Sequence, residues 1–383
     1  MQRSRAGQAV DGALALAAAM GIGRFAYTAL LPATQRALEM ADDVAGALAS
    51  ANLVGYLAGV LLARRLVVRP ERGAALRLGL AATVAATALG AATTSILAWA
   101  VLRTLAGLAS GLVFVLASAA PLEAAAAHGG ILYAGVGVGI ALSGAVAALS
   151  PAAAFAIPWT VLAAAAAALA WPAWSRLATT PGATSPVAGP APGRAELGLR
   201  RLAAAYFLEG LGYIVCGTFA VAAVRRTPGL ERLAPWTWVL TGLAAAPSAL
   251  LWAAAGNRLG LRRALAAAYL LQAAGMALPA LWRSGTAALA GAALFGGTFM
   301  GITTLAMAAG RALAPEAPGR MVATLTAVYG VGQVLGPLLA GSLSRRVGDH
   351  GPAVLAAAAA VGLGGALLAA RARPGPDPSL SRS

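Results

Sequence analysis

The sequence predicts an all-α polytopic membrane protein with twelve transmembrane helices in two pseudo-symmetric six-helix bundles. Three observations support this fold class: an apolar composition, twelve apolar stretches of membrane-spanning length, and glycine patterns that recur in the two halves of the chain. Of the 383 residues, 60% are hydrophobic and only 10% are charged, and the mean hydropathy is +0.78. Soluble domains carry about 25% charged residues, so this composition excludes an ordinary soluble protein.

The twelve apolar stretches are each about 20 residues long, the length that a helix needs to cross about 30 Å of hydrocarbon. The first follows two arginines, as in a signal peptide, but it is too long to be the apolar core of one. We therefore expect it to remain as a helix. The expected spans are 10–31, 44–63, 74–93, 96–120, 130–150, 153–174, 199–222, 234–254, 262–281, 286–310, 320–343 and 352–371.

All 28 basic residues are arginines, and the formal net charge is +16. In a soluble protein this charge would favour nucleic acid as a partner, but here nearly all arginines lie between apolar stretches. Most of them fall in connections that are cytoplasmic if the N-terminus is inside, which is the positive-inside pattern. The sequence therefore predicts a multi-pass protein of the cytoplasmic (inner) membrane, surrounded by the lipid bilayer. Both termini are expected in the cytoplasm, and no nucleic-acid partner is expected.

The longest polar interruption of the chain is rich in Pro, Gly, Ser and Thr, and it divides the spans six and six. Such a composition is typical of a linker without a core of its own. The predicted organisation is an N-terminal six-helix bundle at 1–174, a cytoplasmic linker at 175–198, a C-terminal six-helix bundle at 199–371 and a cytoplasmic tail at 372–383.

Four patterns with small residues recur at nearly constant spacing, which predicts an internal repeat. Gly21-Ile22-Gly23 in the first span returns as Gly210-Leu211-Gly212 in the seventh, 189 positions later. One such pair would be weak, because small residues pack most membrane helices. The other three pairs are Gly59 to Arg64 with Ala253 to Arg258, Gly107 and Gly111 with Gly297 and Gly301, and GIALSG at 139–144 with GPLLAG at 336–341.

At these patterns the chain resembles the major facilitator superfamily of transporters over its whole length. The stretch from Asn257 to Arg263 is similar to that family's cytoplasmic signature Gly-x-x-x-Asp-Arg-x-Gly-x-Arg-Arg, and Arg103 with its following glycines is similar to the helix-4 motif. More narrowly, GIGRFAYTALLP, NLVGYLAG and YFLEGLGYIVCGTF resemble the YbfB/YjiJ-type branch of bacterial transporters. The resemblance implies roles in conformational change for Gly59, Arg64, Gly139, Asn257, Arg258, Gly260, Arg262, Gly336 and Pro337.

The chain departs from the family pattern at three positions. The acidic position of the signature is Ala63 in the first half and Asn257 in the second, so the charged latch that the resemblance implies is missing. Ile140 stands where the helix-5 motif has a proline. Because that motif accompanies proton-driven export in the family, its change weakens the inference of export.

Arg24 lies in the middle of the first span, where an arginine costs roughly 2.5–3.5 kcal/mol on insertion scales. The resemblance implies that spans 1, 4, 7 and 10 line a central cavity. One wet cavity shared by Arg24, Arg103 and Glu209 would remove this cost, because a buried charge must pair, be neutralised or face water. The other residues expected at the cavity are Tyr27, Asn52, Tyr56, Tyr206, Tyr213, Tyr329 and Gln333.

A structural interpretation of the same residues stays open. Arg24 and Glu209 would then form a fixed ion pair between the halves, and Arg103 would bond to backbone carbonyl groups. The polar positions of the second and eleventh spans would serve helix packing. Three further polar residues are expected at caps, interfaces or solvated loops: Asp11, Glu123 and His128.

The sequence predicts a secondary active transporter that moves a small solute by alternating access between the two bundles. We expect coupling to protons at Glu209, because burial and a nearby arginine shift a carboxyl pKa in opposite directions. The alternative is a non-transporting membrane scaffold or receptor with a transporter-like fold. No catalytic constellation or nucleotide-binding loop is recognised, so neither an enzyme nor an ATP-driven pump is expected.

The substrate class stays open between two chemistries. Arginine side chains in the cavity favour an anionic or carboxylated solute, since the guanidinium fork matches a carboxylate. The aromatic positions would equally suit an amphipathic compound. Cys216 and the two histidines form no recognisable metal-ligand set, and we expect no metal, no cofactor and a monomer.

Overall fold

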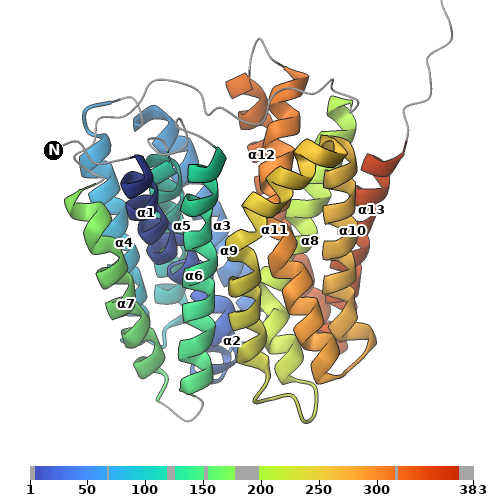
Figure 1. Ribbon diagram of the computed structural model, residues 1–383. Helices are drawn as coiled ribbons and strands as arrows, with labels where there is room; N and C mark the ends of the chain where they lie inside the picture. The colour runs from blue at the N-terminus through green and yellow to red at the C-terminus, as the bar shows by residue number, and fades with distance from the viewer. Residues whose placement is uncertain are drawn as a thin grey trace, which may run out of the picture.

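The computed structural model describes residues 5–66, 69–118, 126–150, 154–176, 198–314 and 318–370 (Figure 1). Twelve helical segments among them are long and apolar enough to cross a membrane, which confirms the predicted all-helical fold and number of spans. The first half contains α1 (Arg5–Leu16), the π-helix η1 (Ala17–Ile22), α2 (Ala26–Ala37), α3 (Asp42–Leu66), α4 (Arg72–Ala91), α5 (Ile96–Ser118), α6 (Ala126–Leu149) and α7 (Ala156–Ser175). The second contains α8 (Leu199–Arg225), α9 (Ala234–Leu259), α10 (Leu261–Leu281), α11 (Gly285–Leu313), α12 (Pro318–Val347) and α13 (Gly351–Ala369).

Several helices extend beyond the apolar stretches that predicted them. α2 continues through Pro32 to Ala37, and α9 continues to Leu259. Gly260 then turns the chain directly into α10 with a φ of 83°, a conformation that glycine adopts at no steric cost. Hydrophobicity therefore marks where a helix crosses lipid, whereas the turn residues mark where it ends.

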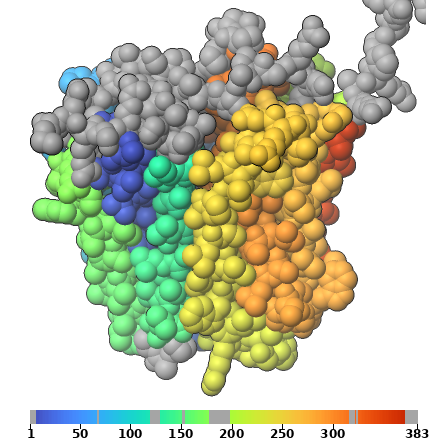
Figure 2. Space-filling model, viewed as in Figure 1, coloured from blue at the N-terminus to red at the C-terminus, as the bar shows by residue number. Residues whose placement is uncertain are grey.

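The two halves lie side by side and meet through three pairs of helices. α6 packs against α9, α3 against α12, and α2 against α8. Figure 2 shows α6 (teal) beside α9 (yellow) along the visible seam. On the α3–α12 contact, a Cβ added to Gly46 would collide with the carbonyl group of Pro337. Small residues thus bring the two backbones into direct contact.

The same helix pairing occurs inside each half. Gly139 of α6 packs directly on Gly21 of η1, and Gly336 of α12 packs on the carbonyl group of Leu211 in α8. The first and fifth spans therefore meet as the seventh and eleventh do, and the glycine patterns GIALSG and GPLLAG stand at both contacts.

At the centre of the seam, residues that are 189 positions apart contact each other. Nη2 of Arg24 donates a hydrogen bond to the hydroxyl of Tyr213 at 3.2 Å, and the hydroxyl of Thr28 donates to the carbonyl of Gly217. The same spacing relates Gly21 to Gly210 in the sequence. Equivalent residues of a two-fold repeat meet each other only on the axis. α2 and α8 therefore cross at a pseudo-two-fold axis between the halves.

The first span is the most enclosed helix of the molecule. In the 18-residue apolar window of the span Ala6–Ala37, 94% of the residues are buried, compared with 72% for the window of α8 and less for every other candidate span. Arg24 therefore lies in the innermost helix and not on a lipid-facing surface.

Candidate functional site

The first span is not a regular α-helix at the GIGRF stretch. Residues Ala17–Ile22 form the π-helix η1, and a turn at 23–25 leads into α2. The backbone N–H of Gly23 bonds to the carbonyl of Ala18, five residues back, at 2.9 Å. A π-helical turn displaces carbonyl groups from the regular ladder, so they need other donors.

Arg103 of α5 supplies those donors. It is 5% exposed, and its Nη1 and Nη2 donate to the carbonyl groups of Gly23 and Arg24, both at 3.3 Å. The guanidinium carbon lies 4.5 Å from the centre of the Tyr27 ring. Asn52 of α3 in turn donates to the carbonyl of Arg103 at 2.8 Å. These contacts match the structural interpretation of Arg103, in which it bonds to backbone carbonyl groups.

Arg24 projects from this bend into a group of aromatic rings. Its guanidinium carbon lies 4.3 Å from the ring centre of Tyr56 and 5.1 Å from that of Phe25. Nη2 of Arg24 bonds to Tyr213, but its Nε has no hydrogen-bond partner. Arg24 is only 5% exposed. Among the described residues no carboxylate forms an ion pair with it. Cation–π contacts compensate only part of the cost of burying such a charge.

The partner of Arg24 belongs to an aromatic stack on the second half, formed by Tyr206, Tyr329, Tyr213 and Phe299. The ring centres are 4.3 Å apart for Tyr206 and Tyr329, 5.5 Å for Tyr329 and Tyr213, and 6.1 Å for Tyr213 and Phe299. Gln333 of α12 donates to the hydroxyl of Tyr213 at 2.5 Å. The Tyr213 hydroxyl is therefore held by one donor from each half.

Glu209 forms its hydrogen bond inside the second bundle. Gln272 of α10 donates to Oε1 of Glu209 at 2.6 Å, and Thr298 of α11 donates to the amide oxygen of Gln272 at 3.0 Å. Glu209 is 1% exposed, and its Oε2 has no partner. We call Glu209, Gln272 and Thr298 the polar chain. It links α8, α10 and α11.

The structure thus brings two of the three predicted cavity charges together and separates the third. Arg103 bonds to the backbone of Arg24, whereas no hydrogen bond or ion pair in the described part of the chain joins Glu209 to either arginine. A fixed Arg24–Glu209 pair between the halves is therefore not present in this conformation.

Sequence reasoning missed Gln272 and Thr298. Gln272 is a fully buried amide in the apolar part of α10. The argument that singled out Arg24, an expensive polar group inside a membrane span, applies to Gln272 as well and would have found it. Thr298 had no such signal, because threonine commonly bonds to its own helix, as it also does here to the carbonyl of Leu294 at 2.7 Å.

The residues with expected roles in conformational change fall into two groups. The glycines at the helix contacts pack on neighbouring backbones: Gly59 on Leu108, Gly139 on Gly21 and Gly336 on Leu211, with Pro337 against Gly46. Arg262 caps the end of α13 by donating to the carbonyl groups of Leu368 at 3.4 Å and Ala369 at 3.0 Å. Arg64, Asn257, Arg258 and Gly260 are exposed at helix ends.

The remaining polar candidates are Asp11, Tyr27, Glu123 and His128. Asp11 is 2% exposed and pairs with Arg176, at the end of α7, across 3.7 Å. Tyr27 donates to the carbonyl of Ala45 at 3.1 Å. Glu123, the side chain of His128, nearly all of the linker 175–198 and the tail 372–383 lie outside the described residues.

Ion pairs close the seam at one end of the molecule. We call this end, which carries the connection from α2 to α3, the far face; it lies opposite the end where α1 begins and α13 finishes (Figure 1). Asp42 accepts two hydrogen bonds from Arg226, at 3.0 and 2.9 Å, and one from Gln35 at 2.7 Å. Asp43 pairs with Arg345 of α12. Both carboxylates belong to the first half and both arginines to the second.

His350 is buried behind these pairs. It is 0% exposed, stacks on Phe219 with ring centres 5.0 Å apart, and has Nε2 3.8 Å from Oδ1 of Asp42. Neither ring nitrogen has a hydrogen-bond partner. Burial and the positive charge of Arg226 lower the pKa of His350 to about 4, although Asp42 and Asp349 act in the opposite direction. The imidazole is therefore neutral near pH 7.

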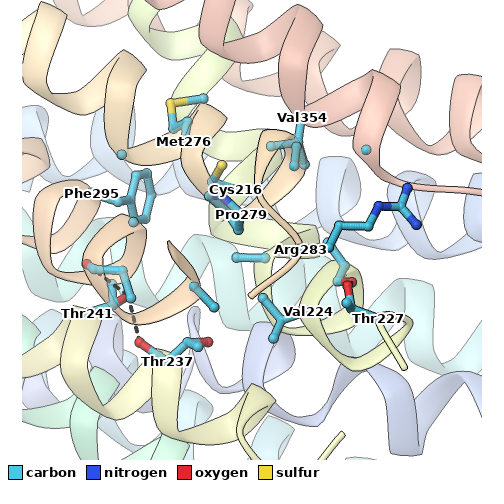
Figure 3. Close-up of a pocket in the computed structure, with 18 of the residues that line it drawn as sticks. Cys216, Val224, Thr227, Thr237, Thr241, Met276, Pro279, Arg283, Phe295 and Val354 are labelled. Atoms are coloured by element: carbon cyan, nitrogen blue, oxygen red, sulfur yellow. Dashed lines mark hydrogen bonds between the residues drawn. The ribbon is translucent and has the colours of Figure 1, made fainter. Parts of the chain in front are cut away.

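A cavity of about 60 Å³ lies inside the second bundle and is lined by residues of α8, α9, α10, α11 and α13 (Figure 3). Cys216, Met276 and Phe295 line its inner end, and Arg283 and Asp349 line its outer end. Its volume is sufficient for several water molecules. Met276 lies one helical turn from Gln272 of the polar chain.

Comparisons with known proteins agree with this architecture. A comparison with curated protein sequences found no match. Among solved structures, a mutant of the nucleoside transporter NupG is similar with a TM-score of 0.72 and 13% identity, over 94% of this chain and 99% of that one. A bacterial homologue of the human lysosomal transporter Spinster, inward-facing and unoccupied, has a TM-score of 0.68 and 15% identity over 96% of each chain. At these identities the two structures show a common fold.

The family match covers nearly the whole sequence. The family described as "Uncharacterised MFS-type transporter YbfB" matches residues 16–369. This range includes the bend of the first span, the aromatic stack and the polar chain. The chain therefore belongs to the YbfB-type family of major facilitator superfamily transporters.

Proposed function

We propose that this chain is a secondary active transporter that moves a small amphipathic organic anion across the cytoplasmic membrane by alternating access, with protons coupled through Glu209. The observation that carries the proposal is the state of Arg24. Its guanidinium is buried at the pseudo-two-fold axis, contacts residues of both halves and has no carboxylate partner among the described residues. An unpaired buried cation is costly, and an anionic substrate would remove that cost.

The surroundings of Arg24 support an amphipathic anion over a purely hydrophilic one. A planar guanidinium fork binds a carboxylate or phosphate by two parallel hydrogen bonds. The Nε of Arg24 is an unused donor for such a group. The rings of Tyr56 and of the aromatic stack offer an apolar and aromatic surface beside it for the body of the substrate.

Coupling to protons is supported by the arrangement of α8. Glu209 and Tyr213 are four residues apart, so they lie on one side of this helix. Tyr213 bonds to Arg24, while Glu209 bonds to Gln272. A substrate acid group that takes Arg24 from Tyr213 frees α8 to shift against α10. Such a shift would change the hydration of Glu209, whose ionised form needs more hydrogen bonds than Gln272 alone supplies.

A route for the proton and a direction of opening are part of the same proposal. Arg283 and Asp349 line the cavity of Figure 3 together with Met276, which lies one helical turn from Gln272 of the polar chain, so water in this cavity would shorten the path of a proton to the chain. The positive-inside pattern of the sequence supports a far face on the outside of the cell. The ion pairs of Asp42 and Asp43 then close the outer side, and the central site would next open toward the cytoplasm.

The substrate class is tested by binding. We expect that a panel of aromatic and aliphatic carboxylic acids, sugars and antibiotics contains carboxylates that raise the unfolding temperature of the purified protein, because a bound ligand stabilises by mass action. Arg24→Gln should abolish the response, and Arg232→Gln, which changes an exposed arginine, should keep it. Stabilisation only by neutral compounds, or an equal response of Arg24→Gln, would contradict the proposed substrate class.

Coupling is tested in proteoliposomes with a substrate from that panel. Glu209→Gln keeps an oxygen that accepts the bond from Gln272, so we expect a folded protein that still exchanges substrate across the membrane. A pH gradient should no longer drive net uptake. Asp11→Asn, which removes another buried carboxylate, should keep the pH response. Net transport by Glu209→Gln that remained fully driven by pH would refute the role of Glu209.

A further inference from the structure

The far face carries a second polar site, separate from Arg24 and from the polar chain. A depression of about 530 Å³ spans the seam, with one wall from the end of α2 and the start of α3 and the other from the ends of α8 and α12. Four arginines line it, together with a single carboxylate. They are Arg36, Arg225, Arg226 and Arg345, with Asp42.

Two of these arginines are already neutralised, and two are not. Arg226 pairs with Asp42, and Arg345 pairs with Asp43 beside the depression. Arg36 and Arg225 have no hydrogen bond or ion pair in the described part of the chain. Arg36 belongs to the first half and Arg225 to the second, and their like charges act on each other across the seam. The carboxylate of Glu231 attracts Arg225 but does not form an ion pair with it.

A buried hydroxyl points to the same ligand chemistry. Ser344 lines the depression, is 0% exposed, and its Oγ has no hydrogen-bond partner. A buried hydroxyl without a partner is uncommon and costs free energy. An anionic oxygen in the depression would accept a hydrogen bond from Ser344. Its negative charge would also offset the repulsion between Arg36 and Arg225.

We propose that this depression binds a metabolite-sized organic polyanion, which bridges Arg36 of the first half to Arg225 of the second and holds the far face closed. The volume is that of a small-molecule site. Guanidinium groups from two sides match a ligand with two or more carboxylate or phosphate groups. Residues of both halves line the depression, so opening of the seam would separate its two walls. A ligand bound between these walls therefore favours the closed state. The binding site stands by itself; its effect on transport rests on the alternating access proposed above.

Citrate, a soluble tricarboxylate, is a suitable probe. We expect millimolar citrate to raise the unfolding temperature of the purified protein by a few degrees relative to chloride at equal ionic strength. The double variant Arg36→Gln/Arg225→Gln should need at least about ten times as much citrate for the same rise in unfolding temperature. The matched control is Arg232→Gln/Arg346→Gln, which removes the same charge from exposed arginines that do not line the depression. It should respond as the wild type does. No response of the wild type, or equal responses of all three proteins, would overturn the proposal.

Two further measurements identify the source of the anion and the closure. In nanodiscs, stabilisation by citrate with purely zwitterionic lipid supports a soluble ligand. Stabilisation of the wild type only by phosphatidylglycerol, lost in Arg36→Gln/Arg225→Gln, would assign the arginines to lipid headgroups and overturn the proposal of a soluble metabolite.

Closure of the far face is measured with spin labels at Glu39 and Thr286, after Cys216, the chain's single cysteine, has been replaced by serine. Citrate should shift the distribution of distances between the two labels to shorter values and make it narrower. An unchanged or longer distance would contradict the proposal that the ligand holds the far face closed.

Failure of this proposal is distinguishable from failure of the proposed transport function. Arg24→Gln should lose the response to the substrate panel and keep the response to citrate. Arg36→Gln/Arg225→Gln should show the reverse. A loss of both responses in either variant would mean that citrate occupies the central site, and the second site would be rejected.

Discussion

The first span and α8 are equivalent helices of the repeat, yet only one of them is bent. Both carry Gly-x-Gly at the same position, but the first span passes through η1 and a turn, whereas α8 is regular from Leu199–Arg225. The difference lies outside both helices. Arg103 of α5 donates to the carbonyl groups that the bend frees. Gly107 of α5 corresponds to Gly297 of α11, 190 positions later. By the same spacing, Arg103 corresponds to Ala293, which has no such donor. Glycine therefore permits the bend, and a donor from another helix stabilises it.

The two helices also divide the charges between them. Arg24 in the first span corresponds to Tyr213 in α8, and Glu209 in α8 corresponds to Met20 in the first span, at the same spacing of 189. The bent helix thus carries the cation and the regular helix carries the acid.

The largest effect is expected from Arg103→Ala, which gives α5 the residue found at the equivalent position of α11. The carbonyl groups of Gly23 and Arg24 would lose their donors inside the protein, at a cost of about 1–3 kcal/mol each. We expect the free energy of unfolding in detergent to fall by about 3 kcal/mol or more. Arg232→Ala, at an exposed position, should change it by less than about 0.5 kcal/mol. A loss under about 1 kcal/mol in Arg103→Ala would show that the bend does not depend on Arg103.

The shared glycines should respond alike in the bent and the regular helix. A Cβ at Gly21 would collide with the backbone of Gly139, and one at Gly210 with the carbonyl of Tyr329. We expect Gly21→Ala and Gly210→Ala each to cost about 2 kcal/mol in chemical unfolding, as overpacking does. Gly297→Ala meets open space and should be neutral or stabilise by up to about 1 kcal/mol. If only one of the two costly variants were destabilised, the helices would not be equivalent at this contact.

A pH effect of intermediate size should arise from His350 of the second half. The folded pKa of His350 is about 4, below the ordinary value of 6.5, so protons bind the opened state more tightly than the closed one. The contribution of neutral His350 to stability is complete above pH 6.5 and is lost as the pH falls toward 4. We expect the far face, followed by spin labels across the seam, to open over this window. His350→Gln should flatten the response, and an unchanged profile would assign it to Asp42 or to another group.

The smallest effect is expected at the exposed pair of Arg283 and Asp349. Their atoms are 2.7 Å apart, but the side chains are 58% and 37% exposed. Exposed pairs contribute about 0–1 kcal/mol. Arg283→Gln should therefore shift the free energy of unfolding by less than about 1 kcal/mol, measured at low salt. A larger loss would mean that the mouth of the cavity in Figure 3 also has a structural role.

Much of the fold was predictable because bilayer physics is simple. Length and hydropathy predict the spans, and the repeat predicts which residues are equivalent, including Arg24 and Tyr213, which meet in the structure. The bend was not predictable from its own residues, because its stabilising donor, Arg103, is 79 positions away from Arg24 in the sequence. Local propensity carries no information about such a partner.

The sequence carried information on the depth of the polar residues but not on the direction in which their side chains point. A polar residue inside a span indicates how deep a group lies, and on that basis Arg24 and Glu209 were placed at one level. Which neighbour a helix face meets depends on its rotation in the bundle, and an apolar helix such as α8 provides little periodicity to fix it. Glu209 consequently meets Gln272 of α10 and not Arg24.

The bond between Arg24 and Tyr213 has a consequence for how such a chain can diverge from a symmetric ancestor. Two identical copies would place the same residue on both sides of the axis, and two arginines would repel each other there, while two tyrosines would leave the centre without a cation. A cation with a hydroxyl partner at this point requires unlike residues in the two copies. A single substitution at this position is therefore enough to convert a symmetric contact between the two copies into a polar, asymmetric one.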